Sequence, residues 1–83
     1  MPKIRPKFTL SSDQYGPIVV EEDGRAHTRV DNDWFLRADA LELPKGETIM
    51  GAQWSSQMGV VLTTSAGNVY THDLGHLASW RQA

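Results

Sequence analysis

The sequence predicts an all-β protein: a small antiparallel domain of about six to eight short strands, arranged as a barrel or sandwich. The first observation behind this prediction is the stretch Val60–Thr64, which is followed by the turn-forming Ser65–Asn68 and a second extended run, Val69–His72. β-Branched and aromatic residues on both sides of a Gly/Asn turn are typical of a β-hairpin. We therefore expect a hairpin over residues 60–72.

The second observation is an internal similarity. When the chain is shifted by 43 positions, residues 12–29 align with residues 55–72 without a gap. The identical pairs are Ser12/Ser55, Gln14/Gln57, Gly16/Gly59, Gly24/Gly67 and Thr28/Thr71. The glycines stand where the start of a strand and a hairpin turn need unusual backbone angles. We expect one domain, residues 1–83, with two repeats, residues 8–45 and 48–83, as one interpretation and a chance similarity of two hairpins as the other.

Four strands are expected in the first half of the chain. They are Phe8–Leu10, Ile18–Glu21, Ala26–Val30 and Trp34–Leu36. The proline-rich residues 1–7 before them predict a flexible N-terminal arm. A two-residue loop at Asp23-Gly24 would place Glu22 opposite Arg25 and Val20 opposite His27. The acidic residues before Trp34 also fit a short helix over residues 34–41, but the alternation in residues 41–43 favours strands.

Four strands are likewise expected in the second half. They are Ile49–Ser55, Val60–Thr64, Asn68–His72 and Leu77–Trp80, the last of which also fits a single helical turn. Gly51 indicates a bulge in the first of these strands. A two-residue loop at Ala66-Gly67 would place Thr63 opposite Tyr70 and Val61 opposite His72.

The repeat resembles the blade of a WD-type β-propeller. Its length of 43 residues falls within the 40–45 residues of such a blade, and Trp54–Ser56, Gly59–Leu62 and Gly67–Leu74 look like a blade's inner strands. The sequence departs from the family where His72-Asp73 replaces the expected Trp-Asp pair, and where the first repeat has Arg29-Val30. The resemblance implies an alternative architecture, two propeller-like blades that oligomerisation completes into a ring, as in small two-blade lectins.

Composition excludes several classes of function. The 83 residues carry 8 basic and 10 acidic side chains, and a net charge of −2 argues against a nucleic-acid partner. There is no cysteine, so no disulfide or thiolate site supplements the core, and oligomerisation is the remaining remedy for a small domain. The chain also lacks the roughly 18–20 apolar residues of a membrane span and an apolar secretory signal. We expect a soluble, cytoplasmic protein without a membrane partner.

No pattern of catalytic or metal-binding residues stands out. His72 and His76 are four positions apart, which suits a metal only on a helix, and Gly75 between them argues against one. The glycines are isolated, so no phosphate-binding loop is present, and no nucleophile motif accompanies the serines. We therefore predict no enzymatic activity, no catalytic residue, no metal ligand and no cofactor.

The tryptophans are the best candidates for a binding role, although large rings mainly fill cores. Trp34 and Trp80 lie near the ends of their repeats, with Arg37 and Arg81 as neighbouring polar groups. These four residues are the predicted partner- or ligand-binding set. We expect a non-enzymatic interaction module that acts through protein–protein contacts, both with itself as a homo-oligomer and with an unidentified protein or small ligand. The alternative is a lectin-like carbohydrate or small-ligand binder with aromatic platforms between blades.

Overall fold

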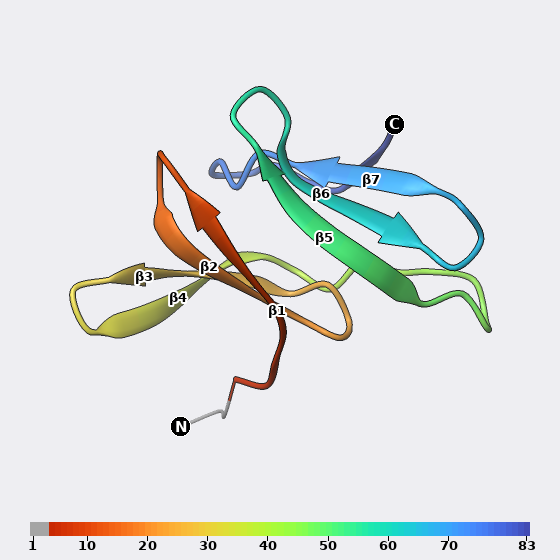
Figure 1. Cartoon of the computed structure of the whole chain (residues 1–83), viewed down its shortest axis with the longest axis horizontal. Helices are drawn as coiled ribbons and strands as arrows, with labels where there is room; N and C mark the ends of the chain where they lie inside the picture. The colour runs from red at the N-terminus through yellow and green to blue at the C-terminus, as the bar shows by residue number, and fades with distance from the viewer. Residues whose placement is uncertain (1–3) are drawn as a thin grey trace.

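Eight antiparallel strands form two four-stranded sheets in the computed structural model, which describes residues 4–83 (Figure 1). The strands are β1 (Pro6–Ser12), β2 (Gly16–Glu21), β3 (Ala26–Val30), β4 (Asp33–Ala38), β5 (Ile49–Ser55), β6 (Gly59–Thr64), β7 (Val69–His72) and β8 (Arg81–Gln82). Sheet 1 has the order β1-β2-β3-β4 and sheet 2 the order β5-β6-β7-β8, so within each sheet every strand pairs with its neighbour along the chain. The described residues contain no helix, and the all-β prediction is confirmed.

The two sheets have the same hydrogen-bonding register. Ser12 pairs with Gly16 in sheet 1, and Ser55 pairs with Gly59 in sheet 2, which is the same pair shifted by 43 residues. The β2–β3 and β6–β7 ladders agree in the same way, and both first strands have a register shift at equivalent places, after Pro6 and after Ile49. The second of these shifts is the bulge expected beside Gly51. This agreement over three features is consistent with an internal duplication.

Both hairpin turns contain three residues instead of the two expected from sequence. Glu21 N donates to Arg25 O (2.8 Å) around Glu22–Gly24, and Thr64 N donates to Asn68 O (3.0 Å) around Ser65–Gly67. In each loop the glycine is the third residue and has a positive φ, 96° for Gly24 and 82° for Gly67. A type I turn followed by a left-handed glycine is a common three-residue hairpin loop.

The longer loops change which residues face one another. The predicted pairs Val20/His27 and Thr63/Tyr70 are wrong by one position, because Val20 pairs with Ala26 and Thr63 with Val69. The pairs Glu22/Arg25 and Val61/His72 are wrong for the same reason: Glu22 lies in the loop, and Val61 pairs with Thr71.

Three element boundaries also differ from the predictions. β1 begins at Pro6, so the last two residues of the expected flexible arm belong to a strand, while residues 1–3 lie outside the described part of the chain. The final strand is residues 81–82 and not 77–80, and residues 41–43 belong to no strand. The interpretation of residues 34–36 as a strand, instead of a helix, is confirmed by β4.

The core lies between the two sheets. Its fully buried side chains are Ile18, Val20, Ala26, Ala38, Ile49, Val60, Leu62 and Leu74, and the rings of Phe8, Tyr15, Trp54 and Trp80 pack against them. Because side chains alternate across a strand, the members from each sheet define one inner face. Val19, His27, Trp34 and Leu36 then occupy the opposite face of sheet 1, which we call the outer face.

The sheets stack with different faces in contact. Ile18 of the inner face of sheet 1 aligns by the 43-residue shift with Val61, and Val61 lies on the outer face of sheet 2. Conversely, the core residue Leu62 aligns with Val19 of the outer face of sheet 1. Sheet 1 therefore offers one face of the repeat to the core, and sheet 2 offers the other. This head-to-tail stacking leaves two different faces free. The outer face of sheet 1 corresponds to the core face of sheet 2, and the outer face of sheet 2 corresponds to the core face of sheet 1.

Candidate binding surface

The structure distributes the four predicted binding residues over three places. Arg37 and Trp80 line one depression together with Tyr70. Trp34 lies at a larger hollow on the outer face of sheet 1. Arg81 lies beside the connection between β7 and β8. The residues of the predicted set thus form no single site.

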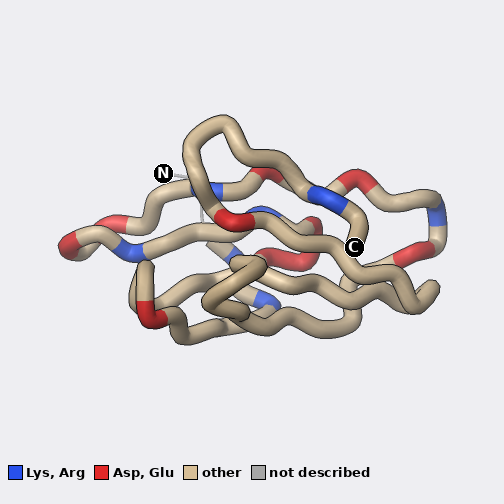
Figure 2. Tube along the Cα trace, turned by 90° about the horizontal axis from the view of Figure 1, so that it is seen from above, with Lys and Arg blue, Asp and Glu red and all other residues tan. Residues whose placement is uncertain are grey.

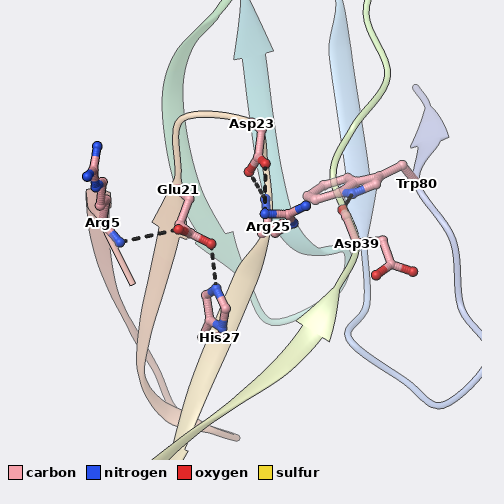
Figure 3. Close-up of polar contacts among 7 residues, drawn as sticks. All are labelled: Arg5, Glu21, Asp23, Arg25, His27, Asp39 and Trp80. Atoms are coloured by element: carbon pink, nitrogen blue, oxygen red, sulfur yellow. Dashed lines mark hydrogen bonds and ion pairs between the residues drawn. The ribbon is translucent and has the colours of Figure 1, made fainter. Parts of the chain in front are cut away.

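Trp80 is held mainly as a structural side chain. Its indole Nε1 donates a hydrogen bond to the backbone oxygen of Asp39 (2.8 Å), which joins sheet 2 to the segment after β4. Its ring lies edge-on to the His72 ring, with centroids 5.1 Å apart, and packs against the core. Figure 3 shows Trp80 beside Asp39. A ring with these contacts is a weaker platform for a ligand than an open one.

Trp34 has the corresponding position in the first repeat but is left uncovered. It pairs with Arg29 in the β3–β4 ladder, and the Arg29 guanidinium lies 5.9 Å from the centre of its ring. Arg29 aligns with His72 by the 43-residue shift, so the two tryptophans contact equivalent residues. Trp80 faces the core between the sheets, whereas Trp34 is 36% exposed on the outer face of sheet 1. Trp34 is therefore the better candidate for contact with another molecule.

Exposed apolar side chains surround Trp34 at the end of the β3–β4 hairpin. Val30 is 43% exposed, Phe35 47% and Leu36 50%. We call the four residues Val30, Trp34, Phe35 and Leu36 the β4 patch. Figure 1 shows this hairpin extending away from sheet 2. Of these four residues, only Trp34 was predicted as a binding residue. The run Trp34–Leu36 is a further signal, because three consecutive apolar residues place apolar side chains on both faces of a strand.

The hollow beside the patch has a volume of about 1040 Å³ and combines apolar and ionic groups. Val19, Trp34 and Leu36 supply apolar surface, and His27 and Glu21 supply a polar pair within it. His27 Nε2 lies 2.8 Å from Glu21 Oε2, and the two side chains are only 10% and 16% exposed (Figure 3). The sequence alone gives no sign of this pair, because it depends on the register of β2 with β3.

The His27 contact stabilises the charged form of Glu21. The hydrogen bond from His27 lowers the pKa of the Glu21 carboxyl below its ordinary value, burial opposes this effect, and the backbone N–H of Arg5 assists it. Along the rest of the trace, acidic and basic positions are interspersed (Figure 2). The Glu21 carboxylate therefore gives the hollow a local negative charge, although the protein as a whole has no strong electrostatic field.

His72 gives a pH-dependent contribution to folding stability. Burial is the main cause that lowers the pKa of His72, while Asp73 and Asp39 raise it. Its Nδ1 accepts a hydrogen bond from the backbone N–H of Leu74 (2.9 Å), which requires that nitrogen to be unprotonated. The folded state therefore binds a proton less readily than the unfolded chain. The associated stability is present above the ordinary histidine pKa of about 6.5 and is lost as pH falls below it.

We expect the melting temperature to fall as pH is lowered from 8 to 5, and we expect His72→Asn to weaken that dependence. Asparagine can still accept the Leu74 hydrogen bond but does not titrate. Thermal unfolding followed by circular dichroism across this range measures both slopes. His76→Asn is the matched control, because His76 is exposed. Parallel pH profiles for the wild type and His72→Asn would contradict the assignment.

The described residues hold no group of three or more His, Asp or Glu side chains placed to bind a metal ion. In residues 4–83 there is also no helix long and apolar enough to cross a membrane. The class that the fold defines is an all-β unit of two stacked four-stranded antiparallel sheets. No family model, curated protein or solved structure matches the chain.

Proposed function

We propose that the chain is a non-enzymatic protein-interaction module that binds through the β4 patch. The observation that carries this proposal is the exposure of Val30, Trp34, Phe35 and Leu36 together at the end of one hairpin. Single exposed apolar residues are ordinary, but a cluster of them marks a contact surface. This cluster covers both faces of the hairpin, with Trp34 and Leu36 on the outer face and Val30 and Phe35 on the inner. Tryptophan at such a patch is a frequent source of binding energy, because it buries a large area at low entropic cost.

Polar groups around the patch suit a protein partner. Arg29 lies over Trp34, and Asn32 accepts a hydrogen bond from Arg29 at the hairpin tip (3.4 Å). Asp33 begins β4 beside them. An apolar centre with a polar and charged rim is the usual anatomy of a protein–protein interface. Self-association is included in this proposal, because a chain of this size gains core by burying the patch against a second copy.

The resemblance to propeller blades bears on how copies would meet. We infer that the two sheets arose from one repeated four-stranded unit. Assembly into a ring would continue their head-to-tail stacking from chain to chain. The outer face of sheet 2, however, carries Gln53 and Thr63 at the positions where sheet 1 has Leu10 and Val20. This polarity disfavours closing a ring through sheet 2. We therefore favour binding through sheet 1.

A small-ligand or carbohydrate site is the second candidate. The depression lined by Arg37, Tyr70 and Trp80 has a volume of about 400 Å³, which is within the range of small-molecule sites. The indole N–H of Trp80 is already used by Asp39, so the ring face would have to supply the contact. Titration with common mono- and disaccharides, followed by tryptophan fluorescence, tests this candidate. A saturable shift that Trp80→Phe removes would support it over the protein-binding proposal.

The protein-binding proposal is tested by cross-linking from the patch. We expect a benzophenone amino acid in place of Leu36 to give covalent protein adducts in cells that express the chain. Trp34→Glu in the same chain should lower their yield at least tenfold, because it places a carboxylate in the apolar contact. Mass spectrometry identifies each adduct as a second copy or as another protein, and either supports the proposal.

The control carries the same cross-linker in place of Leu77. Leu77 is 91% exposed but lies in the connection between β7 and β8, away from the patch. Position 77 should give few adducts. Equal yields from positions 36 and 77, or adducts that Trp34→Glu does not reduce, would contradict the proposal.

A further inference from the structure

Strand β4 is the least protected edge of the two sheets. β1 and β5 lie at the other ends of their sheets, but they contact each other, and β8 has only two residues. β4 has six residues, Asp33–Ala38, without proline, glycine or lysine. Short length, proline, lysine and β-bulges are the usual means by which edge strands avoid pairing with other chains, and β4 has one of these, a register shift at Arg37 near its end. β4 therefore presents a row of backbone donors and acceptors on the side away from β3.

The side chains of β4 favour pairing as well. Trp34 and Leu36 project to the outer face, in line with their pairing to Arg29 and His27, and Phe35 projects to the inner side with Thr28. All three are at least 36% exposed. A strand added beside β4 would cover both faces of this apolar edge. The occupant must then supply a matching extended segment.

We infer that this segment is β4 of a second copy, paired antiparallel about a two-fold axis at Phe35. The inference rests on the proposed function and specifies its self-association. It joins two copies of sheet 1 into one eight-stranded sheet. Such a contact is isologous, so it closes after two copies and leaves no further unpaired β4 edge.

The charges at the two ends of β4 indicate this partner and this register. Asp33 and Arg37 stand two residues before and two residues after Phe35. Directly opposed residues of an antiparallel pair share one face, so self-pairing must be centred on a residue. Centred on Phe35, it places Asp33 opposite Arg37 of the other copy, twice, and Trp34 opposite Leu36. A centre at Trp34 or Leu36 separates the charges.

Both charged groups are available for this pairing. Among residues 4–83, the ion pairs are Arg25–Asp23 and His27–Glu21, so neither Asp33 nor Arg37 has an ionic partner there. Arg37 donates from Nε to the Thr28 hydroxyl (2.8 Å), and its guanidinium lies 6.0 Å from the centre of the Tyr15 ring. These contacts turn the Arg37 guanidinium towards β3, so an ion pair with Asp33 of a second copy requires Arg37 to exchange the Thr28 hydrogen bond for the carboxylate.

The test is the native mass of the full chain, measured by light scattering after size exclusion at several concentrations. We expect the wild type to approach twice its 9.3 kDa monomer mass. Asp33→Arg and Arg37→Asp alone should each raise the dissociation constant at least tenfold, since each opposes like charges twice. The double variant Asp33→Arg/Arg37→Asp restores opposite charges and should recover dimerisation. Circular dichroism confirms that each variant is folded, which matters because Arg37→Asp also loses the Thr28 hydrogen bond.

The outcomes separate this inference from the proposed function. A wild-type monomer up to millimolar concentration would overturn the dimer. So would a dimer that Asp33→Arg does not weaken, or a double variant no better than the single ones. A trimer or tetramer insensitive to these changes would indicate head-to-tail stacking instead. If the chain is monomeric but the cross-linker at position 36 captures another protein, the proposed function stands and only the self-pairing fails.

Discussion

Replacing Gly59 with alanine is expected to prevent folding or to destabilise the protein by more than about 4 kcal/mol, a loss comparable with its whole stability. Gly59 opens β6 with a φ of 89°, a conformation that side chains with a Cβ rarely adopt. A Cβ there would overlap the backbone oxygen of His72 and lie 2.6 Å from Cα of Asp73. Both obstacles are backbone atoms at the end of β7, so relief requires the sheet to distort. Far-UV circular dichroism with urea unfolding measures the effect.

The equivalent position in sheet 1 supplies the matched control for Gly59. Gly16 occupies the equivalent position, opens β2 and has a similar φ of 72°, but no atom lies within 4 Å of the place that its Cβ would take. Gly16→Ala should therefore cost only the left-handed strain, about 1–2 kcal/mol. If the two alanine variants lose equal stability, the close approach of β7 does not determine the need for glycine at position 59.

The strands could be predicted from the sequence because each is marked locally. β-Branched residues in β2 and β6 and the glycines that end or begin the turns were sufficient to place both hairpins. The register was missed by one residue in both, because Asp23-Gly24 and Ala66-Gly67 each suit a two-residue loop as well as the last two positions of a three-residue loop. Which loop forms depends on the backbone conformation of the residue before each dipeptide, Glu22 or Ser65. Residue types alone do not determine that conformation.

The position of the last strand was missed for a tertiary reason. Residues 77–80 look extended, but Leu74 and Leu77 have positive φ values of 65° and 67°, and the chain makes an irregular connection there. Trp80 then reaches back to the Asp39 backbone, a contact between segments 41 residues apart. No local pattern in the sequence indicates that contact. β8 therefore begins one residue beyond the predicted strand.

The candidate binding surface was predictable only in part. Trp34 and Trp80 were equally good candidates because both lie near the ends of their repeats. The distinction arises only when the sheets stack, since stacking covers the face that bears Trp80 and leaves free the equivalent face that bears Trp34. The pairing of His27 with Glu21 likewise depends on the β2–β3 register, which the sequence placed one residue away.

The stacking itself can be tested through two adjacent residues of β6. Leu62 is completely buried between the sheets, whereas Val61 points to the outer face of sheet 2 and lies outside the core cluster although only 4% of it is exposed. Leu62→Ala removes apolar contact and leaves a cavity that two packed sheets cannot easily close. We expect it to cost about 3 kcal/mol. For a domain of this size that corresponds to a fall in melting temperature of about 12–24 °C.

Val61→Ala serves as the comparison because Val61 is buried but does not lie between the two sheets. Its loss of stability therefore measures burial alone. Two methyl groups are removed from a side chain that lies outside the core cluster, so no cavity forms between the two sheets. The expected cost is about 1.5 kcal/mol, which is the transfer free energy alone. Thermal unfolding of both variants at one concentration and one pH gives the difference. Equal losses would mean that the outer face of sheet 2 is as tightly packed as the core. That result would favour head-to-tail assembly through sheet 2 over pairing through β4.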